Sequence, residues 1–220
     1  SGLNLYTLVR STSHVWGYRL ETVSGILRGV TPEAIFPPAI GLGEGASREV
    51  IDIACVPAGL ERDSGKLLIL AGDGVIWERA AGGGDLVPRP LNNTGAWMSP
   101  KAIETYYDPP YLYLYILDTQ ANLVRKYQAY PGGYTDAPPD YPLPDETVNL
   151  RDGMDLAIDG NIYILLRTGK IVKLFQGKAV DFPLDGLDKP LRSPVAIAVS
   201  QARDTEKGSV FVADAGNQRI

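Results

Sequence analysis

Three arginines occupy the same position in a repeated sequence pattern. Each stands five residues before an aliphatic residue of an apolar run: Arg48 before Ile53, Arg151 before Leu156 and Arg192 before Ile197. A guanidinium group binds a carboxylate or phosphate through two parallel hydrogen bonds, so three that converge would bind an acidic peptide or a small anionic ligand. Alternatively, each arginine is structural and bonds loop carbonyls or a neighbouring carboxylate such as Glu49 or Asp152.

Three carboxylates lie on the same apolar runs, close to the aligned aliphatic residues. They are Asp52, Glu104 and Asp155. Oxygen atoms are the ligands that Ca²⁺ and Mg²⁺ prefer, so this set is the candidate for a divalent-metal site. Asp52 and Asp155 share a register, whereas Glu104 is offset by two positions, and the aligned residues of the other repeats are alanines. The alternative is that these carboxylates are solvated or paired with cations.

Long connections precede the apolar runs and carry aromatic side chains. The connections span residues 82–99, 130–152 and 178–194. Trp97 lies in the first, and Tyr134 and Tyr141 lie in the second among prolines and aspartates. Long loops in a compact fold are often functional, and buried aromatic anchors are typical of partner binding. Equally, each connection can fold back as an outer strand that covers a sheet edge.

One histidine and one cysteine limit the catalytic chemistry available. His14 and Cys55 belong to different repeats, so neither a Cys-His pair nor a Ser-His-Asp triad is predicted. A multi-histidine metal centre and a Cys-rich zinc site are excluded within this chain. Gly82-Gly83-Gly84 precedes neither Lys-Ser/Thr nor a helix, and therefore predicts a turn rather than a phosphate-binding loop.

The elements that position these residues form a repeat. Its aliphatic anchors, Ile53, Ile103, Leu156 and Ile197, lie 50, 53 and 41 residues apart. A strand, a tight turn and a second strand are predicted after each anchor, at residues 66–77, 113–127, 161–175 and 209–220, and a further hairpin at 5–18. An anchor strand, a hairpin and room for one more strand in about 50 residues describe a propeller blade. We therefore predict an all-β fold, a β-propeller of antiparallel three- to four-stranded blades, with about four repeats plus a partial one.

The last repeat carries a family resemblance. It reads Ser-Pro-Val-Ala-Ile-Ala-Val at 193–199 and Val-Phe-Val-Ala-Asp-Ala-Gly-Asn-Gln-Arg-Ile at 210–220. Residues 212–220 resemble the second-strand-and-turn signature of the NHL repeat of six-bladed β-propellers, and residues 116–124 are a looser match. The resemblance implies six blades, so we expect this chain to be a piece of a longer propeller rather than a four-bladed ring. Related calcium-dependent lactonases use carboxylates and amides from several blades to bind one metal.

Composition and charge limit the classes of protein to which the chain can belong. The chain is 45% hydrophobic with 24 glycines and 17 prolines, which favours one globular domain, residues 1–220, with many turns. The net charge of −5 argues against a nucleic-acid partner. No apolar run approaches the roughly 18 residues of a membrane span. The low cysteine content suits the cytoplasm, whereas Tyr- and Pro-rich loops favour an extracytoplasmic bacterial propeller, so the localisation is open.

Two functions follow from these observations. The first is a non-catalytic binding or scaffold module without a cofactor, which presents a loop-rich face and channel mouth to a protein, peptide or small anionic ligand, or to the remainder of a longer chain. The second is a Ca²⁺-dependent lactonase-like or hydrolase-like enzyme. The first is favoured because a plausible general base is missing from the sequence.

Overall fold

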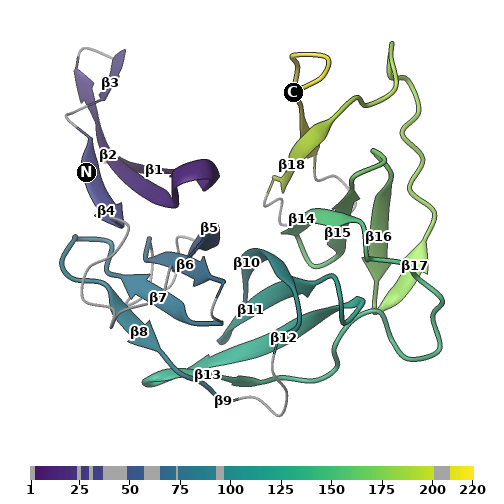
Figure 1. The fold of residues 1–220 in the computed structure, drawn as a ribbon, viewed down its shortest axis with the longest axis horizontal. Helices are drawn as coiled ribbons and strands as arrows, with labels where there is room; N and C mark the ends of the chain where they lie inside the picture. The colour runs from purple at the N-terminus through teal and green to yellow at the C-terminus, as the bar shows by residue number, and fades with distance from the viewer. Residues whose placement is uncertain are drawn as a thin grey trace. The chain divides into compact units, whose positions relative to one another are not determined.

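The computed structural model describes residues 3–23, 26–29, 32–36, 49–56, 65–72, 74–92, 97–200 and 209–220 (Figure 1). These residues form β-strands, turns and a short 3-10 helix, with no α-helix among them. Within the same ranges, no helix has the length and apolarity needed to cross a membrane. The chain divides into two compact units, Ser1–Arg89 and Pro90–Ile220.

The first unit contains two antiparallel sheets. The strands of one sheet are β1 (Leu3–Val9), β2 (His14–Val23), β3 (Ile26–Gly29) and β4 (Glu33–Phe36), with the 3-10 turn η1 (Arg10–Thr12) between β1 and β2. Strand β2 pairs with β1 on one edge and with β3 and β4 on the other. The other sheet has the order β5 (Val50–Cys55), β6 (Leu67–Ala71), β7 (Ile76–Arg79) and β8 (Val87–Arg89).

The second unit contains three sheets (Figure 1). The first comprises β10 (Pro100–Asp108), β11 (Tyr111–Asp118), β12 (Leu123–Tyr130), β13 (Gly133–Asp136) and β9 (Leu91–Asn92) in that order. The next comprises β14 (Gly153–Ile158), β15 (Ile162–Leu166), β16 (Ile171–Phe175) and β17 (Lys178–Val180). The last, in the described residues, pairs β18 (Pro194–Val199) with β19 (Val210–Asp214).

The predicted anchors are confirmed, and so are the hairpins at 5–18, 66–77, 113–127 and 161–175. At 209–220 the first strand forms, but in place of the second strand the structure has only an isolated bridge between Asp214 and Arg219. The four anchors lie in β5, β10, β14 and β18, and each of these strands pairs antiparallel with the strand that follows it. A β-bulge recurs at the start of all four strands, where the ladder skips one residue after Val50, Pro100, Gly153 and Pro194. The bulges fix a common register, and they place Asp52 and Asp155 at equivalent positions as the sequence predicts.

Apolar residues on both faces of each central strand build the core. In β15, Ile162, Ile164 and Leu166 belong to a cluster with the β10–β13 sheet, whereas Tyr163 and Leu165 belong to a cluster with β18. Successive residues of a strand point to opposite faces, so a strand covered on both sides is apolar throughout. In the first unit, the corresponding cluster joins Val15 and Phe36 to Leu67 and Ile69.

The long connections supply outer strands. Residues 82–99 contain β8 and β9, residues 130–152 contain β13, and residues 178–194 contain β17. Strand β9 pairs in parallel with β13, and the Tyr134 N–H donates to the Pro90 carbonyl at 3.1 Å. Of the two alternatives that the sequence left open, the connections therefore take the second and fold back as outer strands at sheet edges, and β17 is exposed along its whole length.

Gly153 is required by close packing at the start of β14. A Cβ atom at this position would lie 2.8 Å from Leu117 Cδ2 and 2.9 Å from the Leu150 carbonyl oxygen, closer than van der Waals contact allows. We expect Gly153→Ala to lower the free energy of unfolding by about 1–3 kcal/mol, because the backbone oxygen cannot move away cheaply. Gly82→Ala is the control, since its Cβ meets no atom within 4 Å. Equal urea midpoints for the two variants would contradict this packing.

Candidate functional site

The sequence-predicted arginines that the structure describes lie at the starts of neighbouring sheets. Arg48 lies outside the described residues. Arg151 and Arg192 are exposed, and each stands two residues before the first paired residue of β14 or β18. Met98 has the same position before β10 and is 56% exposed. Strands β10 and β14 are neighbours, as are β14 and β18, so these three positions follow one another along one edge of the second unit.

The bulge residues of the same three strands extend this edge. They are Lys101, Met154 and Val195, of which Lys101 is exposed, Met154 half-buried and Val195 45% exposed. We call the six residues the strip: Met98, Lys101, Arg151, Met154, Arg192 and Val195. It contains both methionines of the chain and three cations, with the exposed Asp152 beside them. Met98 stands where the other repeats have arginine, and this replacement is the sequence signal that the strip is partly apolar and partly cationic.

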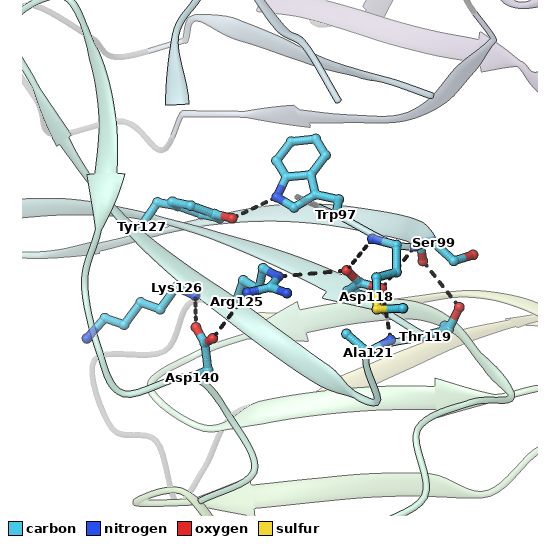
Figure 2. Close-up of polar contacts among 10 residues, drawn as sticks. Trp97, Ser99, Asp118, Thr119, Ala121, Arg125, Lys126, Tyr127 and Asp140 are labelled. Atoms are coloured by element: carbon cyan, nitrogen blue, oxygen red, sulfur yellow. Dashed lines mark hydrogen bonds and ion pairs between the residues drawn. The ribbon is translucent and has the colours of Figure 1, made fainter. Parts of the chain in front are cut away.

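A buried carboxylate fixes the first end of the strip. Asp118, at the end of β11, is 0% exposed and accepts hydrogen bonds from the backbone N–H groups of Met98 at 2.9 Å and Ser99 at 3.0 Å. It also accepts the Ala121 N–H at 3.2 Å, and Arg125 Nε lies 3.7 Å away (Figure 2). The carboxylate therefore joins the segment before β10 to the turn after β11, as turn chemistry predicts for an aspartate at this position.

Asp214 makes the equivalent contacts in the last sheet. It pairs with Pro194 as Asp118 pairs with Pro100, and it accepts the Arg192 N–H at 2.7 Å. Asn217 Nδ2 lies 2.6 Å and Arg219 Nε 3.1 Å from its other oxygen. The backbone of Arg192 is thus fixed while its side chain is exposed.

The middle segment is held by the turn of the preceding sheet instead. Asn122 donates to the Val148 carbonyl and accepts the Leu150 N–H, both at 2.8 Å. Arg151 Nη1 lies 3.4 Å from the Gln120 carbonyl of the same turn. This long contact is the loop-carbonyl role that the structural alternative predicts for the arginine, and it leaves most of the exposed guanidinium donors facing solvent.

The predicted aromatic anchors do not form one exposed cluster. Tyr134 is 2% exposed on β13, so its side chain is buried in this structure, and a contact with a partner stays a prediction. Trp97 Nε1 donates to the Tyr127 hydroxyl at 2.7 Å (Figure 2). Tyr141 is half-buried and stacks on Tyr115 with ring centroids 6.4 Å apart. Strand β13 has only four residues, too few for a sequence pattern to have revealed the burial of Tyr134.

The predicted metal ligands make structural contacts. Asp52 forms a 3.1 Å ion pair with Arg10 in the first unit. In the second unit, Asp155 accepts the Ile197 N–H of the next sheet at 2.8 Å, and Glu104 accepts the following backbone N–H at 2.8 Å. Among the described residues, no group of three or more His, Cys, Asp or Glu side chains is placed to bind a metal ion. A calcium site stays a prediction without a ligand cluster in the described residues.

Comparisons with known proteins identify the fold. No protein-family model matches the chain, and no curated protein matches it. The solved structure of BBS1N in complex with ARL6DN, soaked with lead, is similar with a TM-score of 0.55 and 12% identity, over 95% of this chain and 62% of that chain. A putative 6-phosphogluconolactonase from Bacteroides uniformis has a TM-score of 0.46 and 14% identity, over 96% of this chain and 66% of that chain.

The chain spans less than two thirds of the length of either structure. At this level of identity the likeness to BBS1N shows the fold alone, and it confirms the predicted all-β propeller. Membership of the NHL-repeat family and a single domain over residues 1–220 stay predictions.

Asp214 makes the stability of the second unit sensitive to acid. Burial by itself would raise its pKa, but the donors Asn217, the Arg192 N–H and Arg219 outweigh burial and hold the pKa below the ordinary value of 3.8. The ionised carboxylate therefore stabilises the fold fully above pH 3.8, and this contribution is lost as the pH falls through the lowered pKa of the folded state.

We expect urea midpoints of the wild type to fall more steeply below pH 3.8 than those of Asp214→Asn. Asp185→Asn, which alters an exposed carboxylate, is the control and should retain the wild-type slope. Parallel curves for wild type and Asp214→Asn would show that Asp214 does not bind these donors.

Proposed function

We propose that this chain is a non-catalytic β-propeller module that binds an acidic, partly apolar segment of a protein partner along the strip. The observation that carries the proposal is the alignment of exposed, equivalent positions at the starts of three successive sheets. Their backbones are tied to adjoining turns, so the side chains are presented from a fixed frame, and little ordering free energy is lost on binding.

The charge of the strip favours an acidic partner. Lys101, Arg151 and Arg192 lie along this edge with Asp152, whereas the whole chain carries a net charge of −5. A local basic stripe on an acidic protein attracts an anionic segment and disfavours non-specific association elsewhere on the surface. Guanidinium forks match the carboxylates of such a segment in geometry as well as charge.

The apolar residues favour a polypeptide rather than a small inorganic anion. Met98 is 56% exposed and Val195 45% exposed, and both lie within three residues of a cation of the strip. Methionine adapts its flexible side chain to irregular apolar surfaces, which suits it to peptide recognition. The similar BBS1N chain was solved in complex with ARL6DN, so a propeller of this kind accommodates a protein partner in that case.

Charge reversal on the strip tests this function. We expect Arg151→Glu and Arg192→Glu each to weaken binding of a fluorescent peptide of alternating Glu and Leu by roughly tenfold, because each removes a charge-assisted pair and adds a repulsive one. Fluorescence anisotropy measures the affinity, and added salt should weaken the wild-type complex. Lys178→Glu is the matched control, since Lys178 is an exposed cation on β17, outside the strip.

The apolar part of the strip has its own readout. Met98→Ser should weaken binding of the Glu-Leu peptide and leave binding of poly-glutamate almost unchanged, because only the Glu-Leu peptide presents apolar side chains. Equal losses for Lys178→Glu and the two arginine variants, or no loss for any of them, would overturn the assignment of the strip.

A further inference from the structure

The first unit contains a polar pocket that has no part in the strip. Its volume is about 390 Å³, which is within the range of small-molecule sites. The wall residues that bear functional groups are Asn4, Tyr6, Tyr18, Arg19, Glu33 and Arg79. Gly17, Gly82 and Gly83 also line it and leave room, because they contribute no side chain.

A buried guanidinium dominates the wall of this pocket. Arg79 lies on β7 and is 8% exposed. Its Nε donates to the Gly84 carbonyl at 3.0 Å, and its Nη2 donates to Glu33 Oε1 at 2.6 Å. Removing a guanidinium from water is costly unless an anion pairs with it, so this position requires a carboxylate or an equivalent group. The two bonds also fix the plane of the fork.

The carboxylate that now pairs with Arg79 is easily released to water. The Glu33 side chain is 63% exposed, on the short strand β4, whereas the Arg79 side chain is 9% exposed. A second pair in the same unit, Arg89 with Glu78, has the same 2.6 Å distance but the opposite distribution, with side-chain exposures of 31% and 11%. Only a pair with a buried cation and an exposed anion allows another carboxylate to replace the anion without leaving a buried group unpaired.

Neutral polar groups lie beside the cation. Asn4 Nδ2 donates to the Ala81 carbonyl at 3.1 Å, which orients the amide. Burial, followed by the charge of Cys55, raises the pKa of the Tyr6 hydroxyl, so it stays protonated and available as a donor at neutral pH. Amide and phenol groups of this kind recognise hydroxyl groups through donor and acceptor pairs.

We infer that this pocket binds a small hydroxylated carboxylate, whose carboxyl group displaces Glu33 from Arg79. Glu33 shows that a carboxylate fits the guanidinium at hydrogen-bonding distance. The side chain thus acts as a built-in competitor that is tethered beside the site at high effective concentration. The inference rests on the first unit alone and does not depend on the strip.

Removal of the competitor gives the decisive test. D-glucuronate is the probe, and D-glucose, which has the same ring without the carboxylate, is its control; calorimetry of the full 220-residue chain measures both. We expect wild type to bind glucuronate and Glu33→Gln to bind it at least roughly fivefold more tightly, because the probe no longer competes with a tethered carboxylate. Glu78→Gln, which opens the comparison pair, should bind it as wild type does.

A second variant addresses the guanidinium itself. Arg79→Lys should weaken glucuronate binding at least tenfold, approximately, because lysine keeps the charge but lacks the planar fork. If Arg79→Lys fails to fold, as circular dichroism would show, the comparison of Glu33→Gln with Glu78→Gln still decides. The inference would be overturned if Glu33→Gln bound glucuronate no more tightly than wild type, if Glu78→Gln gained as much affinity, or if glucose bound as tightly as glucuronate. Arg79 and Glu33 would then form a structural ion pair only.

Discussion

A buried carboxylate at the end of a second strand is the contact on which the strip of the second unit, our proposed binding surface, depends. The segment before each first strand is irregular, so its backbone N–H groups have no ladder partner, and burying them unpaired would be costly. Asp118 and Asp214 accept those N–H groups and the donors of the adjoining turn. The same contact therefore closes the turn after the second strand and positions the residues that precede the first strand of the same sheet.

This constraint explains why the exposed residues are ordered without being buried. Met98 and Arg192 are fixed through their N–H groups, which leaves their side chains unconstrained by the core. In the first unit the same need to pair buried polar groups has another solution, since Arg79 takes an exposed carboxylate as its partner. Where a buried carboxylate accepts backbone N–H groups, the backbone is held rigidly. Where a buried cation pairs with an exposed carboxylate, as Arg79 does with Glu33, another carboxylate can take the place of the first.

Local patterns predicted the strands, and long-range pairing decided the roles of single residues. The anchors and hairpins follow from apolar alternation and from turn residues, which act within a few positions of the chain. The burial of Tyr134 depends on strand β9, more than 40 residues earlier, and the acceptor role of Asp155 depends on β18. The Arg79–Glu33 pair spans 46 residues without a motif, so the pocket had no sequence signal.

Amide hydrogen exchange tests the central claim most directly. If Asp118 holds the segment before β10, the Met98 and Ser99 amides exchange slowly in the wild type, although they lie outside the β-ladder. In Asp118→Ala these two amides, with that of Ala121, should lose protection by about tenfold or more, while the β10–β11 ladder amides keep theirs. Unprotected Met98 and Ser99 amides in the wild type, or a uniform loss across the ladder, would contradict the account.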